Sequence, residues 1–77
     1  MEFIVYNRIK AVLAEHGVSN KELAEAVGVS EQMVSNWCVQ KNQPSMKHLY
    51  AIANYLKIDV RELLVPNEQS PRKEFKF

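Results

Sequence analysis

The sequence has a single cysteine, two glycines and three prolines, a composition that does not resemble a disordered chain. One cysteine, Cys38, cannot form an internal disulfide, and its isolation is typical of a reducing compartment, so we expect a cytoplasmic protein. No apolar run approaches the roughly 20 residues that span a bilayer, so no membrane association is expected. The opening MEFIVYNRIK lacks a basic region followed by a long apolar segment, which predicts no signal peptide.

Neither sign of charge dominates, since ten basic and nine acidic side chains give a net charge of +1. A strongly basic chain would have indicated a nucleic-acid partner directly, whereas a balanced chain has to be judged by its motifs. His16 and His48 have no ligand-spaced Cys or Asp beside them, so no metal site is predicted. No nucleophile with a base and no paired carboxylates are recognisable, so we expect no enzyme, no cofactor and no small-molecule substrate.

The 77 residues, 47% of them hydrophobic, are enough for one small domain with a single core. Their apolar residues recur at helical spacing, and the sequence contains no strand-rich region. The sequence therefore predicts an all-α fold, a bundle of five short helices. We expect the domain to cover residues 1–66 and a charged tail to cover residues 67–77.

The first two expected helices have clear limits. One runs from Val5 to Gly17, where a glycine interrupts the apolar stripe formed by Val5, Ile9, Val12 and Leu13. The next begins at Asn20, because Ser19 and Glu22 have the spacing of a capping box. Its buried stripe is expected to be Leu23, Ala24 and Val27.

Only Gly28, Val29 and Ser30 separate the second helix from a third, which Ser30 caps. The expected buried side of this third helix is Met33, Val34 and Trp37. A connection this short makes the two axes cross steeply, which is the pattern of a helix-turn-helix unit. Such a unit projects its second helix outward, where it can enter the major groove of DNA.

Two more helices are expected after the loop CVQKNQPS. Ser45 caps the fourth, whose single apolar face comprises Leu49, Ile52, Ala53 and Leu56. Asp59 and Glu62 form a second capping-box pattern, which predicts a short fifth helix that contains Leu63 and Leu64 and ends at Pro66.

The stretches NRIKAVLAEHGVSNKELAEAVGVSEQMVSNW and QPSMKHLYAIANYLKIDVRELL resemble the helix-turn-helix family of lambdoid phage repressors, Cro proteins and xenobiotic-response-element-type regulators. The resemblance covers residues 7–66. It implies a sequence-specific transcriptional regulator that binds a double-stranded DNA operator as a homodimer. A phage-type repressor, a restriction–modification controller and an antitoxin-like autoregulator all fit. The alternative is a protein-interaction module that has kept the fold without specific DNA binding.

The resemblance also implies which residues contact DNA. Base contacts fall on the start and middle of the third helix, at Glu31, Gln32, Ser35 and Asn36. The amides of Gln32 and Asn36 can pair bidentately with adenine. Glu31 can accept a hydrogen bond from cytosine, or it can repel phosphates and serve only to stabilise the dipole of its own helix. Contacts with the DNA backbone are implied for Asn20, Lys21, Ser30, Lys41, Asn42, Gln43 and Lys47.

Two positions depart from the family's pattern. Members often have a glycine after the recognition helix, where this chain has Val39 and Gln40, so the helix either runs further or ends in a left-handed residue. Members also often have a buried arginine–glutamate pair between the first and third helices. This chain has Leu13 and Cys38 there, which predicts an apolar contact with a largely buried thiol.

The two ends of the chain are apolar, with EFIVY near the start and EFKF at the finish. We expect one or both to lie at a subunit contact. The alternative is that Phe3 and Ile4 extend the first helix and that the tail rests on the surface.

Overall fold

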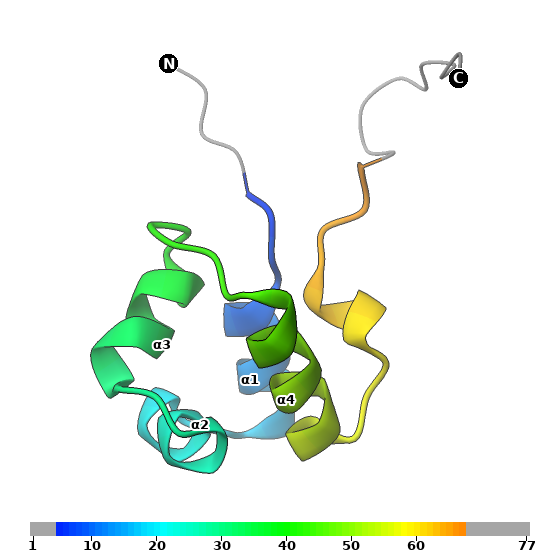
Figure 1. Ribbon diagram of the computed structural model, residues 1–77. Helices are drawn as coiled ribbons and strands as arrows, with labels where there is room; N and C mark the ends of the chain where they lie inside the picture. Colours follow the sequence, from blue (N-terminus) through cyan, green and yellow to red (C-terminus); the bar gives the residue numbers. More distant parts are fainter. Residues whose placement is uncertain (1–4, 68–77) are drawn as a thin grey trace.

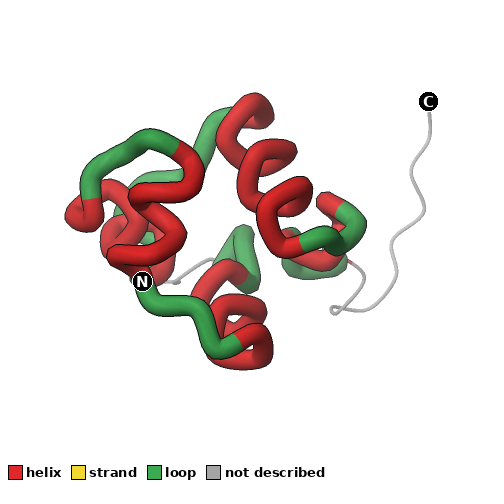
Figure 2. Tube along the Cα trace, turned by 90° about the horizontal axis from the view of Figure 1, so that it is seen from below, coloured by secondary structure: helices red, strands yellow, loops and turns green. Residues whose placement is uncertain are grey.

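Four α-helices and one 3-10 turn surround a shared core in the computed structural model, which describes residues 5–67 (Figure 1). Seen along the other axis in Figure 2, short loops join the helices, and the part of the chain described contains no strand beyond one isolated bridge. The predicted all-α class is confirmed. The elements are α1 (Ile9–His16), α2 (Asn20–Val27), α3 (Glu31–Cys38), α4 (Met46–Leu56) and the 3-10 turn η1 (Val60–Leu63).

Serine side chains begin three of the helices where the sequence placed their starts. The hydroxyl oxygens of Ser19, Ser30 and Ser45 each accept the backbone N–H of the residue three positions ahead, at 3.0–3.1 Å. Each bond satisfies a donor that helix geometry leaves without an intrahelical partner. The carboxylate of Glu22 does not complete the expected box; its Oε2 accepts from the Tyr55 hydroxyl at 2.9 Å and ties α2 to α4.

The turn between α2 and α3 depends on the conformation of Gly28. Its φ of 79° lies in the left-handed region, and its N–H donates to the carbonyl of Ala24 at 2.9 Å. A Cβ added at Gly28 would meet no atom within 4 Å, so the glycine is needed for its backbone angle and not for space. Ala24 is 3% exposed where α2 packs on α3, as expected of a small residue at a close helix crossing.

The core combines residues from all five elements and agrees with most of the expected apolar stripes. Val5 and Met33 are exceptions, with exposed fractions of 44% and 40%. Val5 is exposed because α1 begins only at Ile9, and Met33 because Val34 occupies the inward side of the same turn. Val27 is half-buried at the edge. The buried apolar residues are Ile9, Val12, Leu13, Leu23, Ala24, Val34, Trp37, Leu49, Ile52, Ala53, Leu56 and Leu63.

The expected fifth helix is the single 3-10 turn η1. Asp59 Oδ1 accepts from the N–H of Arg61, two residues ahead, at 2.8 Å, which closes a tighter turn than the capping box predicted. Leu63 is fully buried, whereas Leu64 is 41% exposed because the backbone is extended from that residue on.

Residues 5–8 form an extended segment that lies beside the segment after η1. Arg8 N–H donates to the Leu63 carbonyl at 2.8 Å, and Val65 N–H donates to the Tyr6 carbonyl at 3.0 Å. These bonds flank an antiparallel bridge between Asn7 and Leu64. The expected start of the first helix at Val5 is therefore wrong. Phe3, Ile4 and all of the expected tail except Asn67 lie outside the described residues.

Asn7 is the one buried polar residue among those described, with 3% of its surface exposed. Its Oδ1 accepts the N–H of Ile9 at 3.0 Å, and its Nδ2 donates to the Trp37 carbonyl at 3.1 Å. The same Nδ2 donates to Gln43 Oε1 at 2.8 Å. One side chain thus joins the start of α1, the end of α3 and the loop that follows.

The predicted burial is confirmed for Leu13, but the Cys38 thiol is less buried than predicted. Leu13 is 3% exposed, whereas Cys38 is half-buried at the edge of the core, because it lies in the last turn of α3. Its Sγ donates to Asn20 Oδ1 at 3.7 Å. The ion pairs found within residues 5–67 are Arg8–Glu15 and Arg61–Asp59, and neither links α1 to α3.

Burial raises the pKa of the Cys38 thiol, and the positive charge of Lys10 opposes this shift only partly. The thiolate is the reactive form of cysteine, so a raised pKa slows its reactions near neutral pH. Partial shielding by the core acts in the same direction.

Replacing Asn7 with alanine should lower the free energy of unfolding by about 1–3 kcal/mol, because buried donors and acceptors lose their partners. Urea denaturation followed by Trp37 fluorescence measures this, since Trp37 is the only tryptophan and is 2% exposed. Asn54→Ala, on the exposed side of α4, is the matched control and should leave stability unchanged or slightly higher. Equal stability of Asn7→Ala and the control would contradict the assigned bonding.

Cys38 should react with iodoacetamide several-fold more slowly in the native chain than in the urea-unfolded chain at about pH 7.5. The native rate should keep rising as the pH passes about 8.5, the ordinary thiol pKa, because the folded thiol retains its proton to a higher pH. Mass spectrometry of the alkylated fraction over time gives both rates. A native rate that levels off below the ordinary pKa would show that the surroundings lower the pKa.

Candidate nucleic-acid interface

The outward face of α3 is fixed by the residues that anchor its inward face. Val34 and Trp37 are 0% and 2% exposed, so the helix can rotate little about its axis. The four predicted base-contacting residues lie on the other side, with Glu31 and Gln32 exposed and Ser35 and Asn36 half-buried. Figure 1 shows α3 at the left edge of the bundle, with α2 below it and α1 and α4 to its right.

Gln32 and Asn36 form a pair on this face. Gln32 Nε2 donates to Asn36 Oδ1 at 3.0 Å, one helical turn along. The bond orients both amides and leaves the Asn36 amino group and the Gln32 carbonyl without a protein partner in the described part of the chain. Asn36 Oδ1 also has a second lone pair. The pair can therefore still donate a hydrogen bond from the Asn36 amino group to a ligand and accept one at either amide oxygen.

A shallow groove runs from this pair to the start of α4. It brings together five of the predicted contact residues, which lie on its rim and walls, namely Ser30, Gln32, Asn36, Asn42 and Gln43. Trp37 and His48 also line it, and their rings lie 5.4 Å apart at a tilt of 43°. Ser45 Oγ lies 3.1 Å from His48 Nδ1, which holds the imidazole against the indole.

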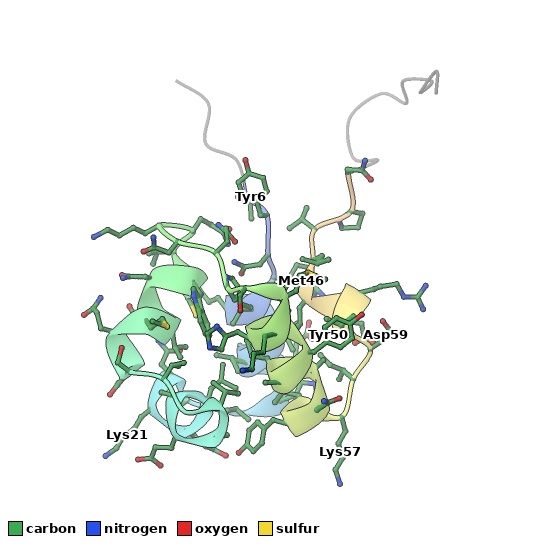
Figure 3. The ribbon with its side chains drawn as sticks, viewed as in Figure 1. Tyr6, Lys21, Met46, Tyr50, Lys57 and Asp59 are labelled. Carbon is green, nitrogen blue, oxygen red and sulfur yellow. The ribbon has the colours of Figure 1, made fainter. Side chains whose placement is uncertain are left out.

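Predicted backbone-contacting residues lie on both sides of α3. Lys21 is exposed in the first turn of α2, on the opposite side of the molecule from Tyr6 (Figure 3). Lys41 and Asn42 are exposed in the loop after α3, and Lys47 is exposed in the first turn of α4. Exposed lysines thus lie on the segments that precede and follow α3 in the chain.

Three of the predicted backbone contacts already have partners within the protein. Asn20 Oδ1 accepts the Cys38 thiol, and Ser30 Oγ accepts the Met33 N–H. Both keep a polar hydrogen that can still be donated. Gln43 is the least available for DNA, because both ends of its amide are bonded: its Oε1 accepts from Asn7, and its Nε2 donates to Gln40 Oε1 at 3.2 Å.

Sequence reasoning missed Asn7 and Gln40 as parts of this region. Gln40 has a φ of 68°, so the second of the two expected ends for α3, a left-handed residue, is confirmed. Its Oε1 accepts from Tyr6 N–H at 3.0 Å, and its Nε2 donates to the Asn7 carbonyl at 3.0 Å. The absence of a glycine at position 40 was the available signal, but nothing local indicated its partners.

Residues 5–67 contain no cluster of metal ligands and no helix that could span a membrane. Within residues 5–67, no group of three His, Cys, Asp or Glu side chains could hold a metal ion. None of the helices described there has the length and hydropathy needed to cross a bilayer.

Comparison with solved structures gives the same architecture. A candidate DNA-binding protein from Bacteroides fragilis is 47% identical, with a TM-score of 0.75 over 77% of this chain and 95% of its own. A transcriptional regulator from Listeria innocua shares the fold at 22% identity, with a TM-score of 0.67 over 75% of this chain and 58% of its own. A comparison with curated protein sequences gives no match.

The helix-turn-helix family model matches residues 9–63, which include every helix of the structure. The match covers the cap at Ser30, the anchored α3 and the apolar face of α4, the features from which the resemblance was first inferred. The chain belongs to the helix-turn-helix family, in its lambda-repressor-like, xenobiotic-response-element type.

Proposed function

We propose that this protein is a sequence-specific transcriptional regulator that reads the major groove of double-stranded DNA with α3. The observation that carries the proposal is the Gln32–Asn36 amide pair, held outward on a helix whose inward face is anchored by Val34 and Trp37. A recognition helix needs both parts, because a side chain can read a base edge only when its helix cannot rotate away.

Asn36 is the principal base reader in this proposal. Its free amino group can donate to adenine N7, and the second lone pair of its Oδ1 can accept from adenine N6. Gln32 supports that geometry and presents its own carbonyl to a neighbouring base. Ser35 reads an adjacent position. Glu31 either accepts from cytosine or only stabilises the helix dipole.

Contacts with phosphates orient the helix in the groove. Lys21 and Asn20 at the start of α2, and Ser30 at the turn, would hold one strand. Lys41, Asn42 and Lys47 would hold the other strand, from the loop and from the first turn of α4. Gln43 is better suited to support the loop than to bind phosphate, because both ends of its amide are bonded within the protein.

One domain covers only half of an operator, so we propose a homodimer on half-sites about 34–36 Å apart. The role requires no metal, cofactor, small-molecule substrate or catalytic residue, and it places the protein in the cytoplasm with the chromosome.

The competing proposal is a protein-interaction module without specific DNA binding. Glu31 and the near-neutral charge favour that module, whereas the outward amide pair and the flanking lysines favour DNA.

Asn36→Ala should weaken binding to a site selected from random DNA by about 1–3 kcal/mol and relax the preference at one or two base pairs. Gln32→Ala should do the same to a similar degree, since it also removes the support for Asn36. Lys41→Ala should weaken binding to all sequences alike and reduce the slope of log affinity against log salt by about one. Site selection and salt titrations with each variant measure these effects.

Two results would count against the proposal. Selection with Asn36→Ala that returns the parental motif would show that α3 reads DNA in another register. Wild-type protein whose affinity for random duplexes is negligible at low salt would favour the protein-interaction module.

A further inference from the structure

The loop between α3 and α4 is held by a residue in a costly conformation. Gln40 has a φ of 68°, and an L-residue with a side chain adopts the left-handed region at a cost that glycine avoids. Unlike glycine, glutamine at this position has a side chain that can form hydrogen bonds, and its carboxamide bonds to the N-terminal segment.

The carboxamide of Gln40 pairs with the extended backbone of the N-terminal segment as a neighbouring strand would. Its Oε1 accepts from Tyr6 N–H at 3.0 Å and from Asn7 N–H at 3.4 Å. Its Nε2 donates to the Asn7 carbonyl at 3.0 Å and to Asn7 Oδ1 at 3.3 Å. Together with the bonds of Gln43, these contacts form an amide network of Asn7, Gln40 and Gln43.

On the side away from Gln40, the N-terminal segment is hydrogen-bonded to η1 and the residues after it, which fixes the position of the network. Arg8 N–H donates to the Leu63 carbonyl, and the Arg8 Nη1 donates to the Glu62 carbonyl at 2.8 Å. Val65 N–H reaches Tyr6 from the same side. Residues 6–8 are therefore hydrogen-bonded to η1 and the segment after it on one side and to Gln40 of the loop on the other.

The loop in turn connects the network to the candidate DNA contacts. Lys41 and Asn42 follow Gln40 directly, and both donate their backbone N–H to the Asn36 carbonyl, at 2.9 Å and 3.3 Å. Any shift of Gln40 would displace a phosphate-contacting side chain and loosen the end of α3 that bears Asn36.

We propose that Asn7 and Gln40 are positioning residues, through which the N-terminal segment Val5–Arg8 holds the α3–α4 loop in its DNA-binding geometry without itself touching DNA. This inference rests on the proposed function. Without the network, the loop would have to be ordered when DNA binds, and that ordering would reduce affinity.

Gln40→Gly is the sharpest test, because glycine adopts the left-handed angle freely and removes only the side-chain bonds. Its thermal midpoint should stay near that of the parent, since relief of the backbone strain offsets the lost hydrogen bonds. Its affinity for DNA should fall about three- to tenfold, the loss expected when one or two groups are ordered only on binding. Its Lys41 and Asn42 amides should exchange faster with solvent in the free protein.

Lys57→Gly is the matched control. Among residues 5–67, Lys57 is the other non-glycine residue with a positive φ, at 60°, and it ends α4 on the opposite side of the molecule from Tyr6 (Figure 3). This variant relieves the same kind of strain, so its thermal midpoint should rise while its DNA affinity and loop exchange stay unchanged. Gln40→Asn, which tolerates the left-handed angle but has a shorter side chain, should behave like Gln40→Gly.

The outcomes separate the two proposals. If the parent binds DNA and Gln40→Gly binds equally tightly with unchanged loop exchange, the positioning role is overturned and the proposed function stands. If the parent does not bind DNA, the proposed function fails. In that case unchanged loop exchange in Gln40→Gly also removes the network as the element that orders the loop.

Discussion

The burial of Val34 and Trp37 is the constraint on which the interface depends. α3 has only eight residues, too few to be a stable helix by itself in water, so its order comes from packing. Both side chains are almost fully enclosed, which fixes the rotation of the helix and thereby decides that Gln32 and Asn36 face outward. Gly28 and Ser30 set its start, and the short turn between α2 and α3 leaves little freedom in the crossing of the two helices.

Polar contacts add to the apolar packing of Trp37 at the other end of α3. Asn7 binds the Trp37 carbonyl and Gln43, while Gln40 binds the backbone of the N-terminal segment. Buried polar groups stabilise a structure only when their bonds are complete, and no side-chain nitrogen or oxygen buried within residues 5–67 lacks a partner. A complete network is also specific in geometry, as the proposed phosphate contacts of the loop would require.

Features that depend on neighbouring residues could be predicted from the sequence. The caps at Ser19, Ser30 and Ser45 act over three residues, and the stripe of α4 repeats at helical spacing, so both were placed correctly. Met33 was predicted to be buried together with Val34, but on so short a helix spacing alone does not show that only one of two adjacent residues faces inward. The prediction of a fifth α-helix was wrong because Asp59 caps a tighter 3-10 turn, and the capping pattern in the sequence is the same for both.

The features that could not be predicted join distant parts of the chain. Gln40 and Asn7 are 33 residues apart, and only the fold brings them together. The departure from glycine at position 40 showed that the end of α3 is unusual, but not that the N-terminal segment compensates for it. Cys38 was placed at the correct helix end, yet its partial exposure depends on how the last turn of α3 meets the rest of the fold.

Whether α3 reads DNA is tested most directly by titrating isotope-labelled protein with a duplex selected from random DNA and following its NMR spectrum. The side-chain amide signals of Gln32 and Asn36 and the backbone signals of Lys41 and Asn42 should shift as the duplex is added. Tyr50 and Leu64, which are exposed on other elements, should not change except through slower tumbling. Shifts confined to Tyr50, Leu64 and their neighbours, with α3 unaffected, would contradict a DNA-reading role for this helix.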